Sequence, residues 1–400
     1  MLIKRIYKKS KQIFSINKAE TLPQINEANS KLIRNVFNKQ HSKNALISFI
    51  TYGMDQSIEN LTHTNILECN TICELLNELD YNVDLIDYDN TNPSIRNIYD
   101  LIVGFGVPIE NILVQGNDKN FKLILYRNGC DQSFADQASL LRVEEVFKRT
   151  GKLLISSSRI SPGFWRAQIR FADLIIALGN KFVADTYQNE TSGRIESLDL
   201  FYYDVNTIDL TIKNFEASKR NFLWFGSFGA IHKGLDLVID YFSRRPDLEL
   251  FICGLNSTEK EFIELYQQKL ALPNIHNLGF VQLQSKQFKE ILYACGAILT
   301  PSVSEAGAPA TLNVIASGGL IPILTANCGV SFDGNEIIIQ ELSERAINIA
   351  IDSFSEIPPD NLMLKSIAIN KFVRERYTYK KFRNNLKSII SKELKIVTTL

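Results

Sequence analysis

The sequence predicts an α/β protein made of two doubly wound domains. Two series of short β-branched and apolar runs of strand length alternate with stretches of helical period. Such alternation is typical of parallel strands joined by crossover helices. Between the two series, residues 204–220 are polar, carry no strong period and suit a hinge. A chain of 400 residues, 45% apolar and 22% charged, is globular and long enough for two cores.

The first series predicts an amino-terminal domain over residues 44–203. Strands are expected at 45–50, 83–87, 101–105, 122–126, 174–178 and 197–202, with helices such as 64–79 and 137–150 between them. The second series predicts a domain over 221–375. Its strands are expected at 222–226, 248–252, 275–279, 296–300, 321–324 and 336–339, and its helices at 235–243, 257–271, 286–294 and 309–318. Doubly wound sheets bind ligands at the carboxyl ends of their strands, so we expect the site in a cleft between the domains.

The overall charge argues against a nucleic-acid partner. Lysine and arginine number 44, as do aspartate and glutamate, so there is no basic excess. The balance is uneven, because residues 1–43 carry ten basic residues against Glu20 and Glu27. Such a basic arm either contacts an anionic membrane surface or is a solvated leader.

The six cysteines show no zinc-site spacing and several lie in apolar runs, which indicates buried free thiols in a reducing compartment. No secretory signal is recognisable, and no segment approaches the roughly 18 apolar residues of a membrane span. We therefore expect a cytoplasmic protein, with peripheral contact to the inner membrane face through the basic arm as the alternative.

Two loops of the second domain predict an anion site. Gly226 opens a loop after the strand 222–226, and Lys233 ends that loop where a helix begins. A cation at the positive end of a helix dipole is most favourable when an anion lies between the two. The second loop leads into the helix expected at 309–318. Pro309 suits the first position of that helix, so the free amides of residues 310–312 would point into the cleft. The common nucleotide fingerprints are absent: Leu235 stands where a P-loop has lysine, and residues 104–106 lack the third glycine of a dinucleotide site.

This set of residues resembles the carboxy-terminal half of retaining family 4 glycosyltransferases, which have the GT-B fold. The resemblance rests on Gly226, on 233–236, on 278–281, on Glu305 with seven residues before Asn313, and on 316–319. It extends more faintly to 172–180 and to 375–382. The latter resembles the closing helix of the family, which implies that residues 376–400 cross back and complete the first domain.

The resemblance implies roles for the donor site. Lys233 would neutralise the diphosphate of a nucleotide sugar, and Glu305 would hydrogen-bond the donor sugar and stabilise positive charge at its anomeric carbon. The remaining donor-binding residues would be Gly226, Ser227, Gly279, Phe280, Thr311, Leu312 and Asn313. Taken alone, Lys233 would be interpreted as a surface lysine that caps a turn, and the alternative for Glu305 is an acid that favours a helix dipole.

Three positions depart from the family pattern. Asn313 replaces a glutamate that accepts hydrogen bonds from the ribose, although an amide can also accept them. Ser227 replaces an arginine that contacts the phosphates in many members, and Glu305 is one residue closer to its proline. These differences indicate a divergent subfamily, an altered donor or lost activity.

Three first-domain residues are candidates for the acceptor side. Gly53 follows the first strand, His63 precedes the helix at 64–79, and Asp131 lies in a loop where some family members place a histidine. Each has a structural alternative, as a turn, a packing residue or a loop residue. Residues 87–89 form an Asp-x-Asp triplet, but such triplets are common by chance, so no metal is predicted.

We therefore expect a retaining, metal-independent, hexosyltransferase-type enzyme that needs no cofactor. It would move a sugar from a UDP or GDP donor to a hydroxyl of a glycan or a lipid-linked acceptor, in bacterial surface polysaccharide or glycan synthesis. The alternative is a catalytically degenerate GT-B subunit that binds a nucleotide sugar or glycan. A nicotinamide-dependent oxidoreductase is disfavoured by the missing fingerprint.

Overall fold

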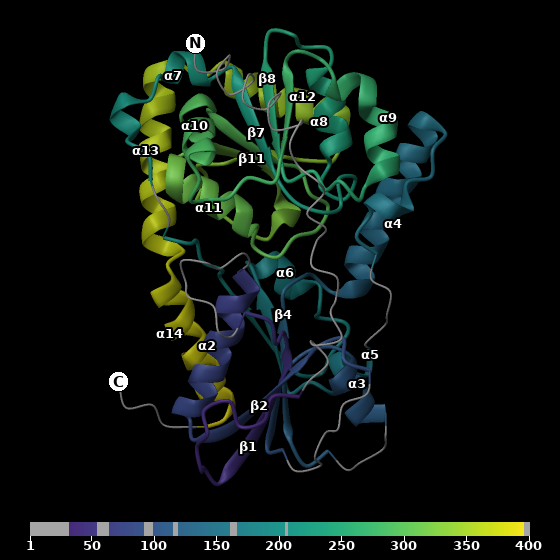
Figure 1. Cartoon of the computed structure of the whole chain (residues 1–400), viewed down its shortest axis with the longest axis vertical. Coiled ribbons are helices and arrows are strands. Elements are labelled where there is room, and N and C mark those ends of the chain that lie inside the picture. Colours follow the sequence, from purple (N-terminus) through teal and green to yellow (C-terminus); the bar gives the residue numbers. More distant parts are fainter. Residues whose placement is uncertain are drawn as a thin grey trace.

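The computed structural model describes residues 32–53, 64–91, 99–114, 119–160, 166–204 and 207–395. They form two sheets of six parallel strands, one above the other, with helices around both (Figure 1). The predicted α/β class with two doubly wound sheets is confirmed. None of the helices described is both long and apolar enough to span a membrane.

The first sheet has the strand order β2-β1-β3-β4-β5-β6. In chain order these strands are β1 (Lys43–Phe49), β2 (Tyr81–Asp87), β3 (Leu101–Gly104), β4 (Lys122–Arg127), β5 (Leu174–Leu178) and β6 (Arg194–Leu198). Its helical elements are α2 (Thr64–Glu78), α3 (Val107–Val114), α4 (Gln132–Thr150), η3 (Ile155–Ser157), α5 (Arg166–Phe171) and α6 (Lys181–Asp185). Alternate residues of β1 pack on opposite faces: Ile47 joins the core under α2, whereas Leu46 joins the core under α3 and α5. Burial on both faces explains the continuous apolar runs of these strands.

The second sheet has the order β12-β11-β10-β7-β8-β9. Its strands are β7 (Asn221–Phe225), β8 (Glu249–Cys253), β9 (Ile275–Gly279), β10 (Ala297–Thr300), β11 (Ile321–Thr325) and β12 (Ile337–Ile339). Helices α8 (Leu235–Phe242), α9 (Lys260–Leu270), α10 (Lys286–Ala294) and α11 (Pro309–Gly318) alternate with them, followed by η5 (Ala326–Cys328) and α12 (Glu344–Ser355). The linker between the sheets contains η4 (Leu210–Ile212) and α7 (Phe215–Ser218).

The strand expected at 197–202 is misplaced, because β6 is Arg194–Leu198. The apolar run after it is buried but leaves the sheet: Phe201 packs on the rings of Tyr379 and Phe382, and the Tyr202 N–H donates to Tyr377 O at 3.0 Å. β6 lies at an edge of the sheet, where charged side chains are tolerated. The hydrophobicity of residues 200–202 therefore correctly predicted that they are buried, but wrongly predicted that they form part of the strand.

The carboxy-terminal helices connect both domains. Helix α13 (Pro359–Arg376) packs against α11 and β11, and α14 (Tyr379–Glu393) continues along the first domain, as the long helices at one side of Figure 1 show. There the Tyr379 hydroxyl lies 2.8 Å from Thr71 Oγ1 of α2, and Lys387 bonds Glu78 at 2.9 Å. The crossing expected of the final helix is thus present in the fold.

Two segments pack against parts of the fold other than those that the predicted domain boundaries suggest. Of the basic arm at 1–43, residues 1–31 fall outside the described part. Ile33 already pairs with β2, through its N–H and the oxygen of Leu85 at 2.8 Å, so the described end of the arm covers an edge of the first sheet. Helix α4 belongs to the first half of the sequence but packs against α8 and α9 of the second domain (Figure 1).

Candidate active site

A cavity of about 590 Å³ lies between the two domains. The second domain supplies most of its wall, from the ends of β7 and β10, the loop after β9 and the start of α11. The predicted donor residues in this wall are Gly226, Ser227, Lys233, Phe280, Glu305, Thr311 and Asn313. The site therefore lies at the carboxyl ends of the strands, as doubly wound sheets require.

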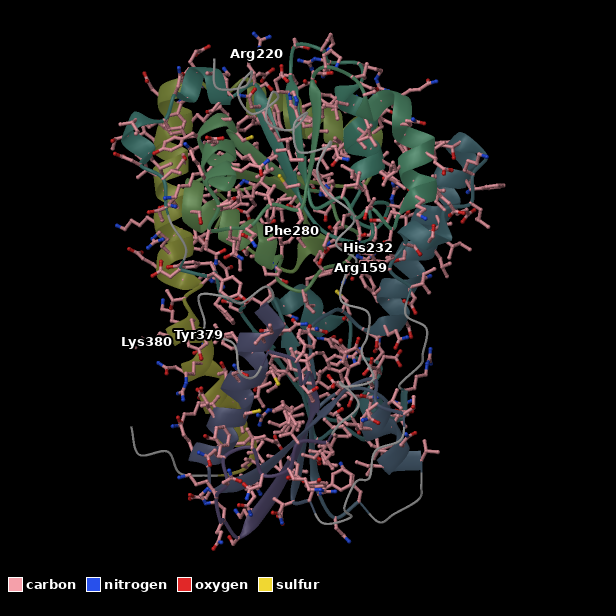
Figure 2. The ribbon with its side chains drawn as sticks, in the orientation of Figure 1. Arg159, Arg220, His232, Phe280, Tyr379 and Lys380 are labelled. Carbon is pink, nitrogen blue, oxygen red and sulfur yellow. The ribbon has the colours of Figure 1, made fainter. Side chains whose placement is uncertain are left out.

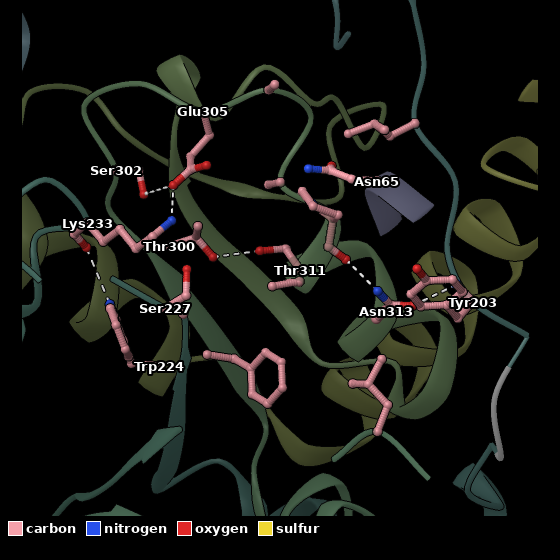
Figure 3. A pocket seen from close by; sticks show the side chains of 18 of the residues that line it. Asn65, Tyr203, Trp224, Ser227, Lys233, Thr300, Ser302, Glu305, Thr311 and Asn313 are labelled. Carbon is pink, nitrogen blue, oxygen red and sulfur yellow. Dashed lines mark hydrogen bonds and ion pairs between the residues drawn. The ribbon is translucent and has the colours of Figure 1, made fainter. Parts of the chain in front are cut away.

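Lys233 and Glu305 meet directly inside this cavity (Figure 3). Lys233 ends the loop that follows β7, and its Nζ bonds Glu305 Oε1, to which Ser302 Oγ also donates at 3.4 Å. Gly234 follows at φ +65°, and a Cβ there would lie 2.5 Å from Pro301 O. The glycine thus allows the lysine loop to lie against the strand end that leads to Glu305.

The ion pair determines the charge state of both groups. Burial by itself would raise the pKa of Glu305, but the charges of Lys233 and Arg159 outweigh it and lower that pKa to about 2. Burial lowers the pKa of Lys233, and the charge of Glu305 opposes this. Glu305 is therefore ionised at neutral pH and has no proton to donate to a leaving group.

His232 is a structural neighbour of the pair. Its Nε2 lies 2.6 Å from Ser304 O and its Nδ1 lies 2.8 Å from Ser139 Oγ of α4. Since a carbonyl can only accept, Nε2 carries the proton and the Ser139 hydroxyl donates to Nδ1. Burial lowers the pKa of His232 to about 4, so the ring is neutral and joins α4 to the loop that carries Glu305.

The start of α11 faces the cavity. Pro309 occupies the first turn, Ala308 before it has φ +44°, and Thr311 Oγ1 lies 2.8 Å from Thr300 Oγ1 at the end of β10. Residues 308–311 line the cavity, and the amides of a first helical turn have no partner within their helix. Leu312, also predicted to bind the donor, is fully buried and is not a cavity residue, and its N–H donates to Ala308 O at 3.1 Å, so the prediction of a free amide at 312 is wrong.

Asn313 already has two partners in the protein. Its Oδ1 accepts from the Tyr203 N–H at 2.7 Å, and its Nδ2 donates to Pro309 O at 2.9 Å (Figure 3). The side chain therefore ties the interdomain linker to α11. Asn313 lines the cavity, and its oxygen retains a second lone pair.

Other predicted residues are placed as follows. Phe280 lines the cavity and is 77% exposed, so its ring is available to a ligand. Gly279 is not a lining residue: its carbonyl accepts from the Gly254 N–H at 2.7 Å. In the first domain, Gly53 packs against Ile66 and does not line the cavity. Asp131 caps α4, since its Oδ1 accepts from the Ser133 N–H at 2.9 Å.

His63 lies outside the described residues. The first aspartate of the 87–89 triplet accepts a hydrogen bond from the Thr51 N–H at 2.9 Å. Across the described ranges, no three His, Cys, Asp or Glu residues gather closely enough to hold a metal ion. All six cysteines are buried and unpaired, as expected.

Sequence reasoning missed several cavity residues. Arg159 comes from the segment after α4, and its Nη1 lies 3.5 Å from Glu305 Oε2. The first-domain wall includes Asn65 and Glu68 of α2, together with Asn128 after β4. Glu68 is buried and accepts from the Tyr126 hydroxyl at 3.0 Å. Glu68 is the one charged residue among residues 64–73, which was the available signal; for Arg159 the sequence offers none.

Two Rossmann-like domains that face each other across a cavity form a fold of the GT-B class. Solved structures of that class are similar over most of the chain. Sucrose-phosphate synthase from Thermosynechococcus elongatus has 13% identity and a TM-score of 0.60, covering 89% of this chain and 100% of its own. HepE from Anabaena, solved with UDP-glucose, has 12% identity and a TM-score of 0.53, with 87% and 99% covered. A glycosyltransferase from Rickettsia africae has 12% identity and a TM-score of 0.52, with 89% and 100% covered.

The sequence comparison agrees with the fold. Residues 209–385 match the family of glycosyl transferases group 1. No curated protein sequence matches the chain. The chain therefore has the GT-B fold, and its second domain matches the family of glycosyl transferases group 1.

Proposed function

We propose that the protein transfers a sugar from a nucleoside diphosphate donor to an acceptor hydroxyl with retention of configuration. The observation that carries the proposal is the direct contact of Lys233 and Glu305 in the interdomain cavity, beside the start of α11. A diphosphate placed there meets a cation and free backbone amides, which are the two features that bind such anions.

The reaction can be written with these groups. The bond between the anomeric carbon and the diphosphate oxygen breaks, and negative charge builds on the leaving phosphate beside Lys233. Positive charge develops on the sugar, where the ionised Glu305 stabilises it. Because Glu305 holds no proton, the acceptor's proton passes to the leaving phosphate as the acceptor oxygen bonds the anomeric carbon. Attack then occurs on the face that the phosphate leaves, which is retention.

UDP is the nucleotide that we favour over GDP, because the similar HepE structures from Anabaena contain UDP or UDP-glucose. The donor charge is met by Lys233 and the α11 amides, so we propose no metal and no cofactor. For the acceptor we propose a hydroxyl of a glycan or lipid-linked glycan, held against the polar first-domain wall of Asn65, Glu68 and Asn128.

A role in bacterial surface polysaccharide synthesis agrees with the resemblance to WaaG, a glycosyltransferase involved in lipopolysaccharide biosynthesis, at 16% identity and a TM-score of 0.50. Such a protein would work in the cytoplasm. Contact with the inner membrane face would be made by the basic residues of 1–43.

The first test is thermal stabilisation by UDP, GDP, ADP and NAD. A ligand at about a hundred times its dissociation constant adds roughly 2.7 kcal/mol to stability. We expect UDP to stabilise the wild type but not Lys233→Ala. The control is Lys365→Ala, at an exposed lysine of α13, which UDP should stabilise as it does the wild type. Stabilisation by NAD alone would contradict the proposal.

The second test is turnover of UDP-sugars, with the anomeric configuration of the product read by NMR. We expect release of UDP, the same anomeric configuration as in the donor, and a loss of several orders of magnitude in Lys233→Ala. An inverted product would contradict the proposed retention. Binding of UDP without hydrolysis or transfer, across a panel of sugars and acceptors, would favour the degenerate binding subunit.

A further inference from the structure

We propose that Arg159, from the amino-terminal half of the chain, binds the donor diphosphate together with Lys233. This inference rests on the proposed function and adds a second cation to the donor site. It extends the donor site beyond the second domain, to a residue that lies 74 positions before Lys233 in the sequence.

The geometry is that of two cations on one carboxylate. Lys233 Nζ bonds Oε1 of Glu305, and Arg159 Nη1 lies 3.5 Å from Oε2. All three side chains line the interdomain cavity. Lys233 and Glu305 are 12% exposed, whereas Arg159 is 44% exposed and, among the described residues, makes one ion pair, which is long. Its guanidinium can therefore turn toward a ligand and give up only this long contact with Glu305.

The local charge also favours an anion. Lys233 and Arg159 carry two positive charges, Glu305 carries one negative charge, and His232 is neutral, so this wall of the cavity has a net positive charge. An arginine matches the oxygens of a phosphate in a planar, bidentate manner, which a lysine cannot do. The two cations would thus contribute differently to diphosphate binding: Lys233 as a point charge, and Arg159 through two parallel hydrogen bonds to phosphate oxygens.

The backbone around Arg159 is attached to the second domain. The Ile231 N–H donates to Ser157 O at 3.3 Å, and Ser156 Oγ donates to Glu261 of α9 at 2.6 Å. Gly229 has φ +96°, and a Cβ on it would lie 2.5 Å from Arg159 Cγ. The glycine loop that leads to Lys233 therefore lies directly against the arginine side chain.

Helix α4, which precedes Arg159, is held to the same domain by buried ion pairs. Arg142 bonds Asp236 at 2.7 Å and Arg149 bonds Asp240 at 2.6 Å, both on α8. Ser139 bonds His232, which lies near Arg159 where the two domains meet (Figure 2). These contacts keep Arg159 with the donor wall if the cleft opens, so both cations are in place before a donor arrives.

The test uses the full chain and titration calorimetry with two probes, UDP and inorganic pyrophosphate. The variants are Arg159→Gln, which removes the charge, and Arg159→Lys, which keeps it. Arg170→Gln is the control, because Arg170 is an exposed arginine of α5 outside the cavity. We expect Arg159→Gln to raise the Kd of UDP roughly ten- to a hundredfold, since a hydrogen bond to a charged group contributes about that much. Arg159→Lys should lie between this variant and the wild type, and Arg170→Gln should match the wild type.

If Arg159 had only a structural role, Arg159→Gln would weaken the binding of UDP and of UMP to the same extent. Arg159→Gln should weaken UDP more than UMP, because the cations flank Glu305, which lies toward the transferred sugar in the proposed reaction. The thermal midpoint without ligand should be nearly unchanged, since exposed ion pairs contribute little.

The outcomes separate the two proposals. An unchanged Kd of UDP in Arg159→Gln, while Lys233→Ala no longer binds, overturns the role of Arg159 and leaves the proposed function intact. Binding of pyrophosphate that depends on Arg159, with no binding of any nucleoside diphosphate, supports the cation pair and overturns the donor. If the wild type binds neither probe, both proposals fail.

Discussion

The side chain of Asn313 holds the backbone of Tyr203 through a hydrogen bond of 2.7 Å between Oδ1 and the N–H. Asn313 lies on α11 of the second domain, and Tyr203 belongs to the linker that leaves the first sheet. The same amide donates to Pro309 O at 2.9 Å, so one side chain joins the linker to the helix start at the interdomain cavity. An asparagine meets both demands because its amide accepts and donates.

Asn313→Ala should therefore lower the free energy of unfolding by about 1–3 kcal/mol, the cost of leaving a buried polar group without a partner. Urea unfolding of the free protein measures this. Tyr203→Phe is the matched comparison, because the buried Tyr203 hydroxyl has no hydrogen-bond partner within the described residues. It should leave stability unchanged. Equal losses in the two variants would contradict the assigned bond.

Glu305→Gln should separate binding from turnover. Without its charge, Glu305 no longer competes with a diphosphate for Lys233 and Arg159, so the Kd of UDP should stay the same or fall. Turnover should fall about 100- to 1000-fold, because the developing positive charge on the sugar loses its counter-charge. Calorimetry and a donor hydrolysis assay give the two values. A rise in Kd that parallels the loss of turnover would show that Glu305 supports nucleotide binding instead.

His232 predicts a loss of stability in mild acid. Its pKa is about 4 in the folded protein and 6.5 ordinarily, so the unfolded chain takes up a proton first as the pH falls. Stability from the neutral ring is complete above pH 6.5 and is lost between there and about pH 4. Glu305, with its folded pKa of about 2 and ordinary value of 4.5, loses its contribution only below pH 4.5.

Urea unfolding at pH 7.5 and pH 5.0 tests this assignment. The wild type should lose about 2 kcal/mol from His232 between these values. In His232→Asn that part of the difference should disappear, while the contributions of the other histidines stay in both proteins. The same pH dependence in the variant would assign the effect to another group.

Asp236 should be essential for the position of α4. It is fully buried and bonds both Arg142 and Arg149, and Arg142 is 3% exposed. Asp236→Asn should cost about 3–5 kcal/mol, since the buried Arg142 loses its buried counter-charge and keeps only the half-exposed Glu145. Glu144→Gln, which breaks an exposed pair with Lys148 on the same helix, is the control and should leave urea unfolding unchanged. If the two variants unfold alike, α4 is held by its apolar contacts.

Much of the fold was readable because it depends on local chemistry. Apolar runs of β-branched residues predicted eleven of the twelve strands within a few residues, and the twelfth failed where a buried run packs as irregular chain beyond β6. Helix α11 begins at Pro309, as its sequence indicates, and Lys233 ends its loop beside α8. These features are set by neighbours in the chain, so the sequence alone determines them.

The completed site depends on residues that are far apart in the chain. Arg159 reaches Glu305 because α4 crosses to the second domain, and Asn313 bonds Tyr203 because the linker passes α11. Glu68 enters the cavity wall through the placement of α2 on the first sheet. Such contacts follow from how helices and sheets pack against one another, and no local pattern encodes them. The sequence by itself determined the two domains and the lysine and acid at the ends of two strands, whereas tertiary packing decided which further side chains share their cavity.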